Sequence, residues 1–260
     1  MIGAIRTADD ARWYRLSVTG LVVLAWVVLA AWGASPFRGL LSHRLIGEAS
    51  VSPIIGFVVF VFGWTLMTIA MMLPSSLPLV NLFRRIVTGR PDSARLTIGL
   101  VLGYLSVWAL FGAVAYRGDA LVHATVAQIP FLAARSTWIV AAILLAAGVY
   151  QFTPLKYMCL EKCRSPYSFL VEHWRGGAAA WDALRLGWRH GLFCLGCCWT
   201  LMLLMFAVGG ANLGWMLALG ALMAAERTTR WGRHLTRPLG VALMLLGVLN
   251  VVGVVVFPVG

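Results

Sequence analysis

The amino-acid sequence predicts an all-α protein, a polytopic transmembrane helical bundle, from its composition, its long apolar blocks and the placement of its charges. Of 260 residues, 61% are hydrophobic and only 12% are charged, whereas a soluble domain carries about 25% charged residues. The mean hydropathy is +0.87. A helix of roughly 20 apolar residues can cross the hydrocarbon core because it satisfies its own backbone groups. We expect a single transmembrane domain over residues 1–260.

Seven apolar blocks are expected to span the membrane. They cover approximately residues 16–34, 53–72, 96–116, 137–152, 191–208, 212–225 and 239–257. We interpret the first block as a retained span, because its apolar stretch is long for a signal peptide and no small-residue cleavage site follows it. Pro74 is expected to break or kink the helix of the second span.

The basic residues alternate between the two sides that these spans define. The N-terminal segment and the loops after the second, fourth and sixth spans hold 17 of the 21 Lys and Arg residues. Because cytoplasmic loops are enriched in Lys and Arg, the N-terminus is expected in the cytoplasm and the C-terminus outside, across a bacterial cytoplasmic (inner) membrane. The net charge of +12 then faces anionic headgroups of the lipid bilayer, and no nucleic-acid partner is expected.

The longest of these cytoplasmic loops contains a segment, residues 166–190, that we expect at the membrane surface. Within it, Trp181, Leu184 and Trp188 follow a helical spacing after the Gly176-Gly177 pair. Aromatic residues at headgroup depth with cations turned outward are typical of interfacial amphipathic helices.

The five cysteines form two spaced motifs at the cytoplasmic ends of the fourth and fifth spans. Cys159 and Cys163 form C-x3-C, and Cys194, Cys197 and Cys198 form C-x2-C-C. Consecutive spans are antiparallel, so both motifs should reach the same membrane face. Their spacing fits a zinc site of four thiolates, and thiolates also bind copper(I) and iron–sulfur clusters. Small buried hydrophobes and disulfides are the alternatives, although disulfides are rare in a reducing cytosol.

Further candidate ligands are expected at the same depth. His190 lies one helical turn before Cys194, and Met71 and Met72 end the second span. Thioether ligands would favour copper(I) over zinc, while packing is the alternative role for the methionines. Glu226 ends the sixth span, where a carboxylate could be a ligand, a proton carrier or an ion-pair partner of Arg230.

Three stretches of the chain resemble a known family. They are AMMLPSSLP at 70–78, QFTPLKYMCLEKCRSP at 151–166 and GLFCLGCCWTLM at 191–202. With Trp215-Met216 and Glu226, they resemble a bacterial family of predicted metal-binding integral membrane proteins. The resemblance implies metal binding and names neither the metal nor an activity.

We therefore expect a membrane protein that handles a soft metal, copper(I) first and zinc second, at the cytoplasmic membrane boundary. Its role would be delivery, storage or passage toward a membrane metalloenzyme. No Ser/His/Asp set is recognisable, and we do not expect an enzyme. Two other readings stay open: an accessory subunit of a larger membrane complex with a structural zinc site, and a membrane thiol–disulfide redox protein.

Overall fold

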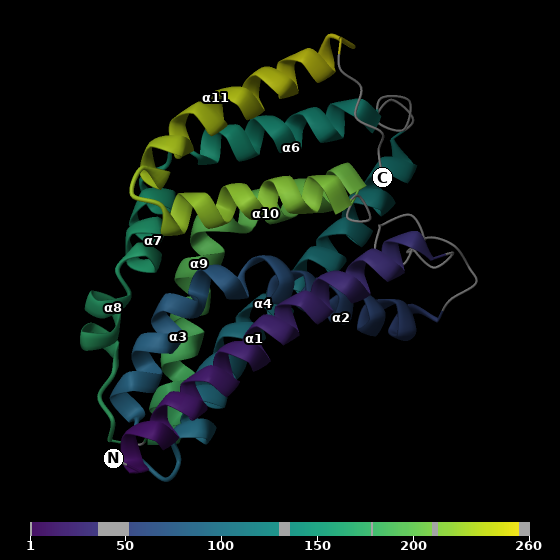
Figure 1. The fold of residues 1–260 in the computed structure, drawn as a ribbon. Helices are drawn as coiled ribbons and strands as arrows, with labels where there is room; N and C mark the ends of the chain where they lie inside the picture. Colours follow the sequence, from purple (N-terminus) through teal and green to yellow (C-terminus); the bar gives the residue numbers. More distant parts are fainter. Residues whose placement is uncertain (1, 36–51, 130–135, 178, 210–212, 255–260) are drawn as a thin grey trace.

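A computed structural model describes residues 2–35, 52–129, 136–177, 179–209 and 213–254. All regular structure in these ranges is helical, which confirms the all-α prediction (Figure 1). The helices are α1 (Ile2–Ala34), α2 (Pro53–Met71), α3 (Leu73–Val87), α4 (Ser93–Gln128), α6 (Ser136–Tyr150), α7 (Pro154–Arg164), α8 (Pro166–His173), α9 (Ala179–Gly209), α10 (Leu213–Thr228) and α11 (Gly232–Val251).

Within the described ranges, five helices are long and apolar enough to cross a membrane: α1, α2, α4, α9 and α11. The count becomes six if the pair α6 and α7, which is bent by 65°, forms one broken span. α10 has 16 residues and is shorter than the helices that qualify. The predicted seven spans and their orientation therefore stay a prediction, and residues 212 and 255–257 of the last two spans lie outside the described part.

The second predicted span breaks where proline was expected to break it. α2 ends at Met71, and α3 begins at Leu73 with Pro74 in its first turn. Pro74 has no N–H to donate to the Ala70 carbonyl, which instead accepts from the Trp26 indole at 3.1 Å. The hydroxyls of Ser75 and Ser76 donate to the carbonyl of Met72 at 2.9 Å and 3.3 Å. The turn places both serines in the interior, where their side chains are buried.

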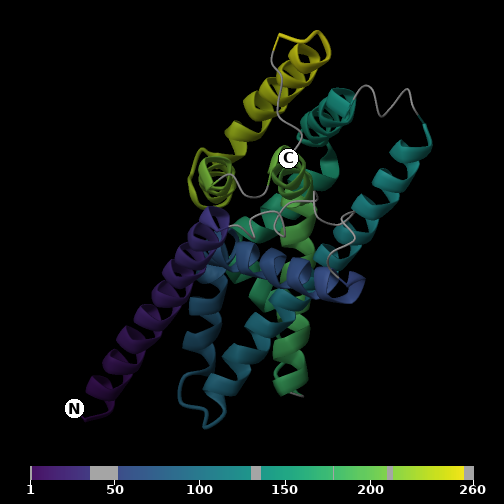
Figure 2. The same cartoon turned by 90° about the vertical axis from the view of Figure 1, so that its right-hand side faces the viewer.

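α9 is one continuous helix that includes the second half of the predicted surface segment. Residues 166–173 form α8, whereas residues 179–190 continue directly into the predicted fifth span. α9 packs along α4, and the two helices lie side by side in Figure 2. A Cβ atom at Gly103 would collide with the carbonyl of Leu184, and one at Gly187 with the carbonyl of Leu100. These two glycines let the backbones touch and fix α9 along its length.

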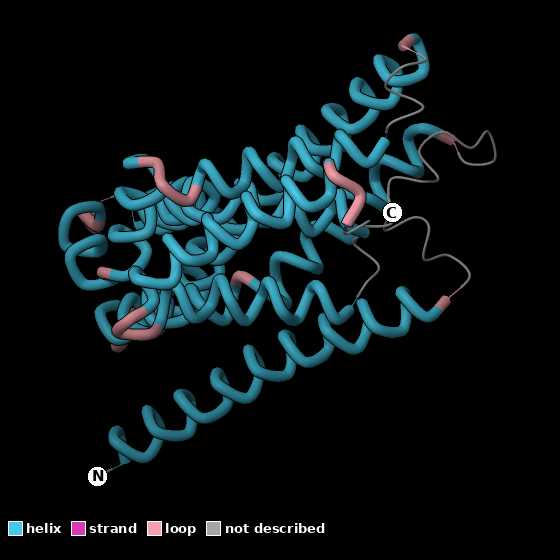
Figure 3. The backbone as a smooth tube through the Cα atoms, turned by 90° about the horizontal axis from the view of Figure 1, so that it is seen from above, coloured by secondary structure: helices cyan, strands magenta, loops and turns pink. Residues whose placement is uncertain are grey.

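α6 and α11 form a second closely packed pair, next to each other in Figure 1. A Cβ atom at Gly148 would lie 2.6 Å from the Met244 side chain, and one at Gly240 would lie 2.6 Å from the Phe152 ring. α1 lies along one edge of the molecule and contacts mainly α2 (Figure 3). The bend between α6 and α7 turns α7 across α9, and this crossing builds the site described next.

Candidate metal site

The two cysteine motifs meet inside the protein, where α7 crosses α9. The Sγ atoms of Cys197 and Cys163 are 4.0 Å apart, and those of Cys197 and Cys198 are 3.3 Å apart. Cys194 lies one turn earlier on α9 and is fully buried. All five cysteines are free thiols. We call Cys163, Cys194, Cys197 and Cys198 the thiol cluster.

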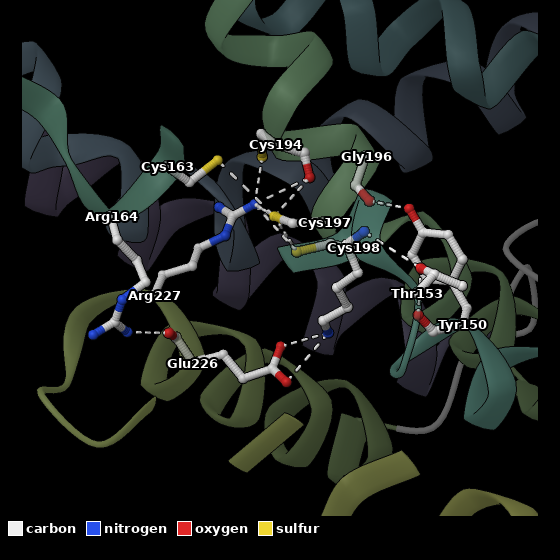
Figure 4. Close-up of polar contacts among 11 residues, drawn as sticks. Tyr150, Thr153, Cys163, Arg164, Cys194, Gly196, Cys197, Cys198, Glu226 and Arg227 are labelled. Carbon is white, nitrogen blue, oxygen red and sulfur yellow. Dashed lines mark hydrogen bonds and ion pairs between the residues drawn. The ribbon is translucent and has the colours of Figure 1, made fainter. Parts of the chain in front are cut away.

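Arg227 of α10 reaches into the thiol cluster (Figure 4). Its Nη2 atom donates to the Sγ atoms of the three α9 cysteines, at 2.7 Å to Cys194 and 3.1 Å to both Cys197 and Cys198. Its Nη1 atom donates to the Ser75 hydroxyl at 2.8 Å. The side chain is buried, and a guanidinium stays charged in proteins. A buried cation is stabilised by an anion, so this arrangement favours thiolate sulfur.

A second buried charge pair lies beside the cluster. The Lys156 ammonium of α7 donates to the Glu226 carboxylate of α10 at 2.9 Å, and both side chains are only 1% exposed. Glu226 therefore pairs with Lys156 across the helices, and not with Arg230 as the local spacing suggested. Arg164 of α7 donates to the carbonyls of Glu226 and Thr229, which ties the end of α10 to α7.

Cys159 contacts α9 at a different point from Cys163. Its sulfur lies against Gly196, where a Cβ atom would be 2.5 Å from Sγ. The Tyr150 hydroxyl donates to the Gly196 carbonyl at the same crossing. Within the described residues, the Cys159 sulfur makes no hydrogen bond to another thiol. Gly196 thus allows α7 to approach α9 closely, and Cys159 fills the contact.

His190 lies at the edge of the cluster, one turn before Cys194 as predicted. Its Nε2 atom is 3.3 Å from the Ser76 hydroxyl, and its buried Nδ1 atom has no hydrogen-bond partner among the described residues. Its ring packs against Tyr104, with centroids 5.6 Å apart. The Tyr104 hydroxyl is in turn 3.0 Å from the Cys194 sulfur.

The two candidate methionines are buried in the same hydrophobic core as the cysteines of α9. The Met71 side chain packs against Gly220 of α10, two turns before Arg227. Met72 is fully buried at the break between α2 and α3. Further buried methionines in this core are Met67, Met202, Met205, Met216 and Met223.

The sequence interpretation missed Arg227, Tyr104 and Ser75. Arg227 was counted among the loop cations that set topology, yet it lies in the last turn of α10. A signal was present in the sequence, because Glu226-Arg227 follows directly on an apolar stretch. The structure buries both residues. Nothing local in the sequence marked Tyr104, which is 90 positions away from its sulfur partner.

Across the described residues, no group of three or more His, Cys, Asp or Glu side chains is arranged to hold a metal ion. Nη2 of Arg227 lies among the sulfurs that an ion would need. The chemistry of the donors suits a soft ion, because the thiol cluster supplies sulfur ligands and the buried Nδ1 atom of nearby His190 has no hydrogen-bond partner among the described residues.

Residues 61–250 match the model of a family described as PpoB2, copper chaperone. No curated protein and no solved structure matches the chain. The matched range includes every candidate ligand named above. It confirms that the family is metal-related, under a description different from that of the predicted metal-binding integral membrane proteins.

Proposed function

The chain belongs to the PpoB2 copper chaperone family, and we propose that it holds its cargo, copper(I), in the thiol cluster. The proposed ligands are Cys163, Cys194, Cys197 and Cys198, with Cys159 as a further thiol and His190, Met71 and Met72 as secondary ligands. Copper(I) is favoured over zinc because thiolate and thioether sulfur are the ligands that select it. The observation that carries the proposal is the meeting of the two cysteine motifs at a buried crossing of α7 and α9.

Arg227 gives the proposed site a suitable charge. Copper(I) bound by two thiolates carries a net charge of −1, and the guanidinium compensates for it in a buried environment where uncompensated charge is costly. For the ion to enter, the Nη2 atom must withdraw from the sulfurs that it now contacts. Ser75 already binds Nη1 at 2.8 Å and can retain the guanidinium nearby.

The proposed setting is the bacterial inner membrane, with the thiol cluster at its cytoplasmic boundary and the N-terminus inside. The apolar helices and the distribution of basic residues support this placement. The proposed role is delivery of copper(I) toward a membrane metalloenzyme or another membrane subunit.

Copper content tests the proposal. The protein is purified from membranes under reducing conditions, loaded with copper(I), and analysed by mass spectrometry. We expect about one copper per chain in the wild type and strong loss in Cys194→Ser/Cys197→Ser. Cys159→Ser is the comparison variant, because among the described residues its sulfur makes no hydrogen bond to the cluster thiols, and as a further thiol it should cost less copper than the double variant. Wild-type protein that binds no copper would refute the proposal.

The same measurement separates the other readings. Tightly bound zinc, with loss of folding when the cysteines are replaced, would indicate a structural zinc site in an accessory subunit. A metal-free protein whose thiol count falls on oxidation would indicate a thiol–disulfide redox protein.

A further inference from the structure

A small charged cavity lies between the end of α8 and the first turns of α9, away from the thiol cluster. Its volume is about 80 Å³. The residues that line it are His173, Arg175, Asp182, Arg185 and Arg189. None of them belongs to the proposed copper site, so the cavity requires a separate explanation.

Three of the five residues that line this cavity are arginines. Among the described residues, the guanidinium groups of Arg175, Arg185 and Arg189 make no hydrogen bond or ion pair. Asp182 is the only lining carboxylate, so the cavity carries a formal charge of +2 with His173 neutral. The nearby Glu172 carboxylate is already bound to Lys162 at 2.5 Å. Both Lys162 and Arg189 lower the pKa of Glu172.

Unpaired guanidinium groups around one cavity are suited to a particular ligand class. Arginine presents a planar fork of N–H donors that matches the oxygens of phosphate, often two at a time. Three such groups in a small space, against the single carboxylate of Asp182, favour binding of an oxyanion that accepts hydrogen bonds from two guanidinium groups at once. We propose that this cavity binds a phosphate group, from an anionic phospholipid headgroup or from free phosphate.

The surroundings favour the lipid as the source. On α9, the same helix that carries Arg185 and Arg189, Trp181 is 61% and Trp188 is 42% exposed. On α8, Tyr167 is 68% and Val171 is 66% exposed. Exposed aromatic residues next to arginines are typical of the lipid–water boundary, where cations contact anionic headgroups. A headgroup phosphate in the cavity would leave its acyl chains next to this apolar face.

Lipid and phosphate binding can be measured on the full chain in neutral detergent. The probes are short-chain phosphatidylglycerol, short-chain phosphatidylcholine and inorganic phosphate, and the readouts are the thermal midpoint and lipid retention in native mass spectrometry. Arg185→Gln/Arg189→Gln should weaken phosphatidylglycerol binding by about 30-fold, and Asp182→Asn should strengthen it by about 5-fold. Arg85→Gln/Arg95→Gln is the matched control, since it removes the same charge at exposed positions outside the cavity.

The possible outcomes distinguish a lipid headgroup from free phosphate as the ligand, and two of them would refute a phosphate site in this cavity. Phosphatidylglycerol binding that depends on Arg185 and Arg189 supports a headgroup site, whereas a response to inorganic phosphate alone supports a free-anion site. Equal losses in the two double variants would show only a general attraction of positive charge and would overturn the proposal. Absence of binding by either phosphate source would also overturn it. The unliganded thermal midpoint of each variant controls for folding.

Discussion

The guanidinium of Arg227 donates to the sulfur of Cys194 across 2.7 Å, and both side chains are buried. An arginine in this position does more than fill space, because a buried cation lowers the free energy of an adjacent thiolate and of an anionic metal–thiolate complex. It also competes with a metal ion for the same sulfurs. Arg227 is therefore expected to influence both the affinity for copper(I) and the release of the ion.

Replacing Arg227 with Gln should weaken copper(I) binding by about 10–100-fold, the range observed when partners of metal ligands are removed. The reason is that the negative charge of the copper–thiolate complex then lacks its buried counter-charge. Competition with a chromophoric copper(I) chelator measures the affinity. Arg233→Gln, which removes an exposed cation paired with Glu161 at 3.6 Å, is the control and should not change it. An unchanged affinity in the Arg227 variant would show that the guanidinium has no part in binding.

Glu226→Gln should destabilise the fold by about 3–5 kcal/mol, because it leaves the Lys156 ammonium buried without a counter-charge. The pair is 2.9 Å apart with both side chains 1% exposed. The free energy of unfolding in mixed detergent is the measurement. Glu172→Gln breaks a pair between Glu172 and Lys162 whose side chains are 52% and 35% exposed, and it should change the free energy of unfolding far less, because solvent screens exposed charge pairs. Equal effects of the two variants would contradict this account.

Composition and charge were sufficient to predict helices, and the antiparallel order of two spans was sufficient to bring the cysteine motifs together. That inference works because it depends only on connectivity and on the depth of each motif. It succeeds for Cys163, which meets Cys197 at 4.0 Å. It also brings Cys159 to α9, where the sulfur lies against Gly196, next to Cys197 in the chain, and makes no hydrogen bond to another thiol among the described residues.

The charged partners could not be predicted, for a different reason. Lys156 and Glu226 are 70 positions apart, and Arg227 lies at least 29 positions from the sulfurs that it contacts. The spacing along one helix identifies only neighbours on that helix, so it suggested Arg230 as the ion-pair partner of Glu226. The sequence also did not predict that residues 179–190 continue into the fifth span as one helix. The contacts that support this segment come from Leu100 and Gly103 of α4, which are distant in the chain.

Gly103→Ala should separate α4 from α9 and destabilise the protein by about 1–3 kcal/mol, as overpacking of a filled interface does. The added Cβ would meet the backbone of Leu184, which cannot rotate away as a side chain could. Gly118→Ala is the control on the same helix, because nothing lies within 4 Å of its added Cβ. The unfolding free energies of both variants are compared with the wild type. A tolerated Gly103→Ala would contradict the close approach of the two backbones.

Gly196→Ala should impair copper loading more than any other alanine substitution outside the ligands. The new Cβ would lie 2.5 Å from the Cys159 sulfur and 3.3 Å from its Cβ atom. Rotation of the sulfur relieves only the first contact, so α7 should shift away from α9 and carry Cys163 away from Cys197. Removing the obstructing sulfur should reverse the effect, because Cys159→Ala leaves the four thiols of the cluster in place. We therefore expect the double variant Cys159→Ala/Gly196→Ala to bind copper(I) better than Gly196→Ala alone, a non-additivity typical of residues in contact. The chelator competition measures all three variants. If Cys159→Ala alone abolishes binding, Cys159 is itself a required ligand. That result would contradict the expectation that the other four thiols bind copper(I) without it.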